Sequence, residues 1–350
     1  MKKFTYLAAF AIGAMTLASC SNDEVLSSVE KSGAIGFSAM ANKSGRSGEV
    51  TTDNIARFRV YGWTTNLDAT TNFATIFDGT DPVLKKTEGW TYTNTQYWAP
   101  SRDYYFVAIS SNNMEKKWEF TPPTEMTQSY DETTFKGLGT LTTDIADVKA
   151  DRDIVYAYAF RKTNANLTNT TVVPFSFYHM LSRIGVAFKN AIGSTGYKMV
   201  ISNVKIKGFN KKGSVQLGDE PSALAWKVDA AEGTTAVDFP VPADAPIEKD
   251  GTSESEYRFV IPGKQTLTIE FNVEVKVGNS TYSTRTLSGT IAAKEYKPGI
   301  SYMFTAEINQ KNIVEGGAKP IEFTVSSITG WGTDEPGSIV LPETTTPGTN

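Results

Sequence analysis

The sequence predicts an all-β protein built from two antiparallel β-sandwiches. Apolar and polar residues alternate with a period of two along most of the chain, and apolar residues at helical spacing are rare. Clusters of Gly, Pro, Asn, Asp, Ser and Thr separate the alternating runs, as turns separate strands. Many short strands without intervening amphipathic helices indicate sandwiches. The length of 350 residues favours two of them, since a domain usually spans roughly 100–200 residues.

Composition excludes several classes of function. The chain has 34 Lys and Arg against 38 Asp and Glu, a net charge of -4, so it lacks the basic footprint of a nucleic-acid-binding protein. One Cys and one His allow neither an internal disulfide nor a Cys-based or multi-His metal site. No glycine-rich phosphate loop or calcium-binding loop occurs either. We therefore expect no cofactor and no metal.

The N-terminus has the pattern of a lipoprotein signal peptide. Two lysines precede an apolar run of eleven residues, Leu7 to Leu17, which is too short for a membrane-spanning helix of about 20 residues. Small residues follow, and then the one cysteine, Cys20. We expect residues 1–19 to be removed, Cys20 to carry lipid, and residues 20–32 to form a lipidated linker. Lipid chains supply about 0.8 kcal/mol per buried methylene, so two or three anchor a protein stably.

The clearest strand runs from Leu267 to Val277, where every second residue is apolar. Gly278-Asn279 then turns the chain, but the phase of the return strand stays open. A two-residue loop would set Tyr282, with the threonines that follow it, opposite the apolar stripe. A three-residue loop would instead set Leu287 and Ile291 there, because one residue of register exchanges the two faces of a strand.

Other runs of apolar alternation predict strands on both sides of a polar stretch over residues 163–170. We place a domain boundary at this stretch, with an N-terminal β-sandwich over 33–170 and a C-terminal β-sandwich, with a C-terminal tail, over 171–350. The predicted strands are Ile35/Phe37/Ala39, Phe58/Val60, Tyr105/Val107/Ile109, Ile154/Tyr156/Tyr158/Phe160, Phe175/Phe177, Ile184/Val186/Phe188, Val204/Ile206, Tyr257/Phe259/Ile261, Tyr302/Phe304/Ala306/Ile308 and Ile321/Phe323/Val325.

Five segments, taken in order with the lipoprotein start, resemble the Bacteroidetes fimbrillin family, which comprises type V pilins and Mfa-like surface lipoprotein adhesins. The second of them reads Phe-Arg-Val-Tyr-Gly-Trp, and the third holds an aromatic–His–Leu–Ser–Arg pattern. The fourth holds Pro-Gly-x-x-Tyr, and the last is a closing Ile-x-x-Trp. The segments are Ala34–Ala39, Phe58–Trp63, Phe175–Ile184, Lys297–Phe304 and Ile328–Trp331.

The resemblance implies two tandem transthyretin-like sandwiches, exported as a lipid-anchored precursor to the outer membrane and cell surface. In polymerising members a protease cuts after Arg or Lys in the loop behind the first strand, which then leaves. An extended segment of another subunit adds in its place by β-augmentation. Here the resemblance points to Arg46, in a loop tip of small polar residues, with Ser47 as the new N-terminus. The removable strand would hold Ile35, Phe37 and Ala39.

A polymerising chain also needs a donor strand. Ile339, Val340 and Leu341, which lie between Pro336-Gly337 and Pro342, are the candidates. The same segment also suits a native edge strand that ends at Pro342, since proline cannot donate to a ladder. The implied partners are other pilus subunits, outer-membrane lipid through Cys20, and a host glycan or protein. Fimbrial subunit, tip and anchor, each with a role in adhesion, all agree with these features.

Catalysis by a histidine base would depend on His179, since the chain has no other histidine. His179 is in phase with Phe175 and Phe177, which predicts a hydrogen-bonded core residue, and no Gly-x-Ser-x-Gly nucleophile elbow accompanies it. Asp151-Arg152-Asp153 is interpreted as a loop before the strand at Ile154. A bulge near Ser182-Arg183 would explain a shift of apolar phase after Leu181. We predict no catalytic residues.

A different function uses the aromatic residues. As an alternative, the chain is a non-polymerising surface lipoprotein that binds a carbohydrate or host ligand through exposed aromatics. Trp90, Tyr92, Tyr97 and Trp98 lie close in sequence around a predicted turn and could form a stacking platform. The same rings could instead fill the cores of the sandwiches. Exposed, coplanar tryptophan faces would favour binding, and buried rings would contradict it.

Overall fold

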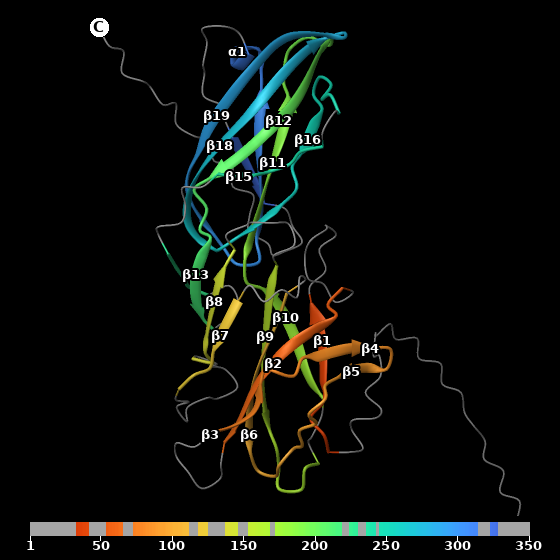
Figure 1. The fold of residues 1–350 in the computed structure, drawn as a ribbon, viewed down its shortest axis with the longest axis vertical. Coiled ribbons are helices and arrows are strands. Elements are labelled where there is room, and N and C mark those ends of the chain that lie inside the picture. Colours follow the sequence, from red (N-terminus) through yellow and green to blue (C-terminus); the bar gives the residue numbers. More distant parts are fainter. Residues whose placement is uncertain are drawn as a thin grey trace, which may run out of the picture.

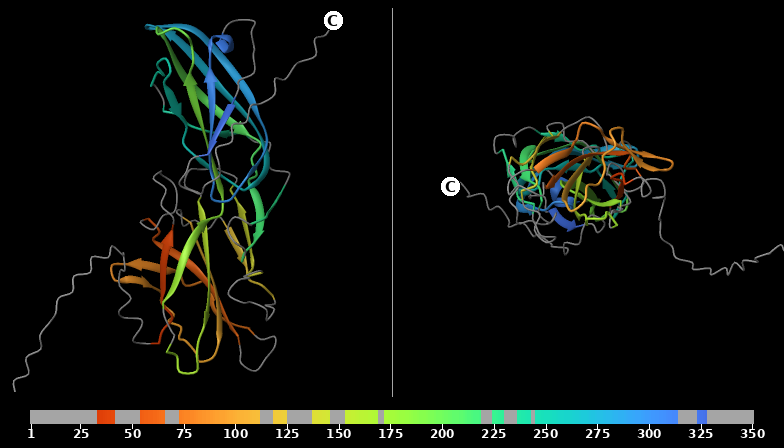
Figure 2. Two further views of the ribbon diagram at one scale, coloured as in Figure 1. Left: turned by 180° about the vertical axis from the view of Figure 1, so that it is seen from behind. Right: turned by 90° about the horizontal axis from the view of Figure 1, so that it is seen from below.

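The computed structural model describes residues 33–41, 54–65, 73–111, 118–124, 137–145, 153–168, 172–218, 224–229, 236–242, 245–313 and 323–327. Strands make up most of this part, in two pairs of sheets that lie end to end along the long axis of the molecule (Figures 1 and 2). Cys20, Arg46, Ser47, Ile339, Val340 and Leu341, which are the predicted lipidation, cleavage and donor residues, lie outside the described residues.

The lower pair in Figure 1 contains an eight-stranded sheet and a four-stranded sheet. The larger sheet has the order β1-β10-β9-β6-β2-β4-β5, with β3 also paired to β2. Its strands are β1 (Phe37–Ala41), β2 (Arg57–Thr65), β3 (Phe73–Asp78), β4 (Val83–Lys86), β5 (Gly89–Thr91), β6 (Asp103–Ser111), β9 (Ile154–Lys162) and β10 (Val173–His179). The smaller sheet, β14-β13-β8-β7, consists of β7 (Trp118–Thr121), β8 (Thr140–Asp144), β13 (Lys212–Gln216) and β14 (Trp226–Val228).

The upper pair consists of the sheets β15-β12-β18-β19 and β16-β11-β20-β21, with β17 also paired to β11. The first contains β12 (Tyr197–Lys207), β15 (Val237–Asp238), β18 (Gly263–Val277) and β19 (Ser280–Tyr296). The second contains β11 (Ser182–Asn190), β16 (Thr252–Glu254), β17 (Arg258–Val260), β20 (Ser301–Ile308) and β21 (Phe323–Ser327). One short helix, α1 (Gln310–Ile313), follows β20. Among the described residues, no helix has the length and apolarity needed to cross a bilayer.

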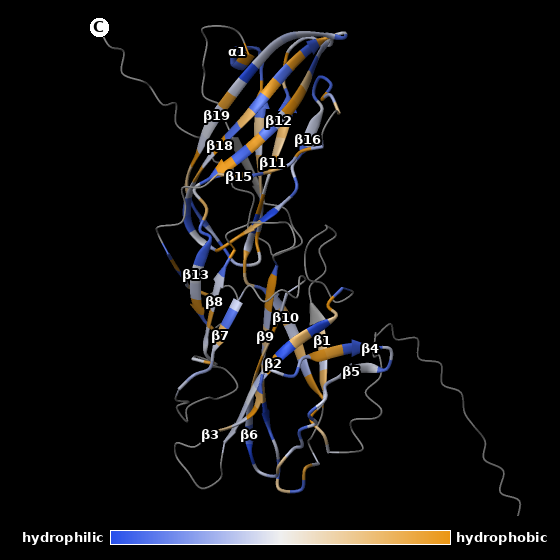
Figure 3. Ribbon diagram, in the orientation of Figure 1, coloured by the Kyte–Doolittle hydropathy of each residue, from blue (hydrophilic) through white to orange (hydrophobic). Residues whose placement is uncertain are grey.

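Alternation of apolar and polar residues along the strands gives each sheet a dry face. The bands of hydropathy along β12 and β18 show this pattern directly (Figure 3). One core, which includes Phe188 and Phe271, lies between the two upper sheets. A second, which includes Tyr156 and Val215, joins the two lower sheets, and a third lies on the opposite face of the large sheet. The all-β sandwich prediction is therefore confirmed.

The hairpin of β18 and β19 settles the register that the sequence left open. Gly278-Asn279 form a two-residue turn, since Val277 pairs with Ser280 and Gly278 has a positive φ of 60°. A bulge at Tyr282 then inserts one extra residue into β19. Leu287 therefore pairs with Phe271 on the apolar face, as a three-residue loop would have arranged, and Tyr282 is 54% exposed.

The shift of apolar phase after Leu181 has a different cause from the one predicted. β10 ends at His179 in the lower pair of sheets, and β11 begins at Ser182 in the upper pair. The chain therefore changes sheets at Met180 and Leu181, which are both fully buried, and the predicted bulge near Ser182-Arg183 was wrong.

Two pairings, β1 with β10 and β11 with β20, are parallel.

Strands from both sides of residue 170 pair in the lower sheets. β10 pairs with β9, and β13 pairs with β8. The division into residues 33–170 and 171–350 stays a prediction, and any cut at that point would separate strands that share a ladder.

Candidate functional site

The first strand of the described chain, β1, occupies a slot in the lower pair of sheets. On one side it pairs in parallel with β10, from Phe37 opposite Val173 to Ala41 opposite Phe177. On the other side, the residues just before β1 meet residues 96–98: Ile35 N donates to Gln96 O at 2.8 Å, and Trp98 N donates to Gly33 O at 3.1 Å. Residues 33–35 therefore bond to residues 96–98, while β1 itself is the edge strand of the sheet and pairs with β10.

Phe37 attaches β1 to the core beneath it. Its side chain is 3% exposed, and its ring meets five aromatic rings, with centroids 5.3–6.3 Å apart. The Phe175 ring stacks on it, while three others meet it edge to face, which are the preferred geometries of aromatic pairs. The five rings are those of Phe58, Phe77, Tyr92, Phe106 and Phe175.

The other two residues of the predicted removable strand also face this core. Ile35 is 1% exposed, and Ala39 is half-buried against the same cluster. The Tyr92 hydroxyl donates a 2.6 Å hydrogen bond to Ile35 O, and burial raises the pKa of that phenol. Ile35, just before β1, and Phe37 and Ala39, within β1, thus face the same core. Sequence analysis missed Tyr92 and β10 as their partners.

The slot is apolar and aromatic rather than chemically reactive. The rings that surround Phe37 come from β2, β3, β6 and β10 and from the segment after β5. If β1 left, these rings would lose their cover, and a surface of that kind marks a protein interaction site. The slot therefore suits an extended segment that carries a large apolar residue at the position of Phe37.

His179 is a buried structural residue, as its phase predicted. The ring is 5% exposed, and its Nδ1 lies 2.9 Å from Oδ2 of Asp153, a fully buried carboxylate. The pair joins the end of β10 to the residue before β9. Sequence analysis missed Asp153 as the partner, because one carboxylate among 38 acidic residues carries no signal of its own. No group of three potential metal-ligating side chains occurs within the described residues.

The five tryptophans that the structure describes do not form an exposed platform. Trp63, Trp98 and Trp118 are 4–6% exposed, and Trp90 is half-buried with its ring 4.8 Å from that of Phe58. Trp226 is half-buried too, and its indole N–H donates to Met180 O. These rings contradict a ligand site built from exposed tryptophan faces. Of the group around Trp90, Tyr97 is the exposed member, at 62%.

The described chain is almost entirely β-strand, and one short strand, β1, covers an aromatic cluster of the lower sheets. The fimbrillin-like family model matches residues 46–331. The chain therefore belongs to the fimbrillin-like family, as its motifs predicted. No curated protein sequence matches it significantly.

Several solved structures are similar to this chain. A protein of Bacteroides uniformis assigned to cell adhesion shares 16% identity, covers 86% of this chain and 100% of its own, and has a TM-score of 0.44. The fimbrial anchor protein Mfa2 of Porphyromonas gingivalis shares 10% identity over 85% of this chain and 98% of its own, with a TM-score of 0.36. A fimbrial assembly protein of Parabacteroides distasonis shares 11% identity over 84% and 95%, with a TM-score of 0.39.

Proposed function

We propose that this protein is a cell-surface fimbrial subunit that assembles by donor-strand exchange, with a structural role and no catalysis. The observation that carries the proposal is the burial of the Phe37 side chain among five aromatic rings. A single strand of five residues covers an aromatic cluster of the lower sheets. Its release would create a binding slot without disturbing the order of the other strands in the sheet.

The pairing of β1 favours replacement by a second chain. β1 and β10 run parallel over five residue pairs, and parallel pairing is slightly less stable per residue than antiparallel pairing. An incoming segment that runs antiparallel to β10 would therefore gain stability at each residue. Main-chain hydrogen bonds would supply its affinity, and the cavity left by Phe37 would supply its specificity.

The remaining parts of the proposal come from segments outside the described residues. Lipid on Cys20 would hold the precursor at the outer membrane, with the folded chain at the cell surface. Cleavage after Arg46 would separate β1 from the rest of the chain, with Ser47 as the new N-terminus. Ile339, Val340 and Leu341 of another subunit would supply the donor strand.

Replacing the proposed cleavage residue, Arg46→Ala, should prevent both maturation and polymerisation. Without the cut, β1 stays covalently attached to β2 and competes for its own slot at a very high effective concentration. We expect the variant to remain monomeric where the wild type gives a ladder of polymers on mild denaturing gels. Lys43→Ala, three residues earlier in the same loop, is the matched control and should leave the ladder intact. An unchanged ladder from Arg46→Ala would remove the proposed cleavage step.

A further inference from the structure

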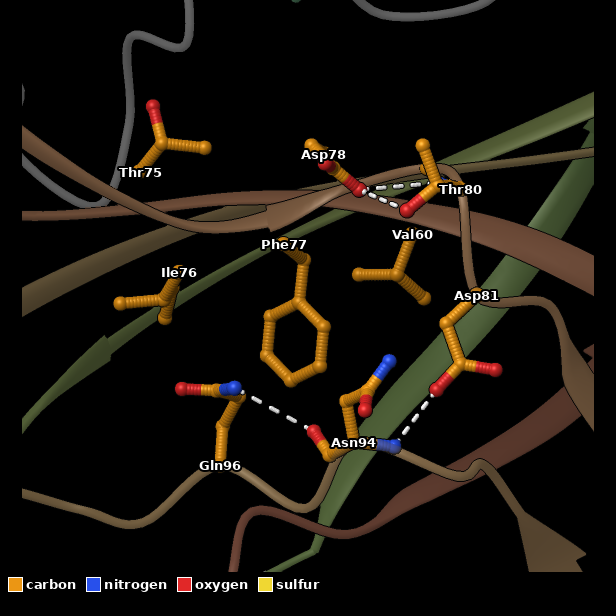
Figure 4. A pocket seen from close by; sticks show the side chains of 10 residues that line it. Val60, Thr75, Ile76, Phe77, Asp78, Thr80, Asp81, Asn94 and Gln96 are labelled. Carbon is orange, nitrogen blue, oxygen red and sulfur yellow. Dashed lines mark hydrogen bonds between the residues drawn. The ribbon is translucent and has the colours of Figure 1, made fainter.

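A cavity of about 200 Å³ lies beside β3 and the loop that follows it (Figure 4), and Phe77, one of the rings around Phe37, forms part of its lining. Most of its polar lining consists of carboxylates, carboxamides and hydroxyls, while Phe77, Ile76 and Val60 supply the apolar part. No lysine or arginine is among the described residues that line it. The polar lining residues are Thr75, Asp78, Thr80, Asp81, Asn94 and Gln96.

The loop on one side of the cavity is held in place. Oδ1 of Asp78 accepts hydrogen bonds from Thr80 N at 2.9 Å and from Thr80 Oγ1 at 2.6 Å. The Arg59 guanidinium donates a further hydrogen bond to Gly79 O in this loop. Gly79 has a φ of +77°, and a Cβ there would lie 2.3 Å from the Tyr61 ring, so only glycine fits between the loop and that ring.

On the opposite side of the cavity, the Asp81 carboxylate holds the segment around residues 93–94 in place. Oδ2 of Asp81 accepts from the backbone N–H groups of Thr93 and Asn94, both at 2.7 Å. Gln96 Nε2 donates to Asn94 O at 3.2 Å. Figure 4 shows the Asn94 carboxamide between the Phe77 ring and the Asp81 carboxylate. The polar groups therefore converge on one space, and the site is preformed, as ligand pockets usually are.

The chemistry of this lining matches one class of ligand. A pyranose ring has an apolar C–H face and a rim of hydroxyls that both donate and accept hydrogen bonds. Ile76, which is half-buried, offers apolar surface to the first over the buried Phe77 and Val60 side chains, while carboxamides and carboxylates offer partners to the second. Hydrogen bonds from Thr80 lower the pKa of the Asp78 carboxyl, so this group is ionised at neutral pH and repels anionic sugars.

We propose that this cavity binds a single neutral sugar residue, a hexose or an N-acetylhexosamine, at the end of a glycan. The volume suits one ring rather than an extended chain, and the paired acids exclude sialylated and sulfated sugars. This site uses hydrogen-bonding side chains of β3 and of two loops, and it does not depend on exposed tryptophans or on release of β1.

Binding of the full exported chain to immobilised neutral and acidic glycans, followed by titration calorimetry with the matching methyl glycosides, tests the proposal. We expect binding to a neutral sugar and none to the acidic ones. Asn94→Ala removes one carboxamide, and Asp81→Asn keeps an oxygen for both backbone N–H groups while it removes the charge. Each should weaken binding by about tenfold or more.

Ser202→Ala, in the separate hollow between β12 and β15, is the matched control and should bind as the wild type does. Unfolding midpoints of all variants show whether each one is folded. The proposal is overturned if no neutral sugar binds, or if Asn94→Ala and Asp81→Asn, both folded, bind as the wild type does. Preference for acidic sugars, or loss of binding on removal of divalent cations, would also overturn it.

Discussion

Phe37→Ala is expected to lower the free energy of unfolding of the chain that retains β1 by about 3–5 kcal/mol. The ring is 3% exposed, and its removal would leave a cavity among five aromatic side chains of the lower sheets. Since the rings around it come from different strands, the site can collapse only in part. Urea-induced unfolding at neutral pH measures the change.

Ser38→Ala is the control for this variant. Ser38 is the next residue of β1, points to the opposite face and is half-buried. Its replacement should change the free energy of unfolding by no more than about 0.5 kcal/mol. If Phe37→Ala unfolds at the same urea concentration as Ser38→Ala, the aromatic slot does not hold β1, and the proposal for strand exchange loses its physical basis.

Asp153→Ala is expected to destabilise the protein by about 1–3 kcal/mol. Asp153 is fully buried, with Oδ2 2.9 Å from Nδ1 of His179, and the pair links the ends of two neighbouring strands of the large sheet. Removing one partner of a buried hydrogen bond leaves the polar atom of the other partner without that bond in an apolar environment, which costs about 1–3 kcal/mol. Thermal or urea unfolding gives the difference from the wild type.

The matched control for Asp153 is Asp103→Ala, at the start of β6. Asp103 lies 3.7 Å from Lys162, and the side chain of that lysine is 73% exposed. Such a surface pair contributes about 0–1 kcal/mol. Equal effects of the two substitutions would show that burial of the His179–Asp153 pair has no special energetic role.

Local pattern was enough to predict several of the longer strands and the burial of His179. The alternation around Phe271 predicted β18, and the phase of His179 with Phe175 predicted a hydrogen-bonded core residue. The alternation of Ile35, Phe37 and Ala39 predicted a strand here, and the strand in the structure begins at Phe37, after Ile35. These features depend on residues that lie close together in sequence, which is where periodicity carries information.

Long-range pairing was beyond what a single sequence reveals. The parallel ladder of β1 and β10 joins residues more than 130 positions apart, such as Phe37 and Val173. The Tyr282 bulge reverses the face that a two-residue turn would otherwise impose. The sugar-sized cavity combines Asp81 with Asn94 from two loops, and loops carry no periodic signal.

The N-terminal residue of the protein at the cell surface tests assembly by strand exchange most directly. Mass spectrometry of N-terminal peptides from the surface fraction and from purified fimbriae distinguishes the two forms. Strand exchange predicts that assembled copies begin at Ser47, with β1 absent. Assembled copies that all begin at the lipidated Cys20, with β1 still present, would contradict it.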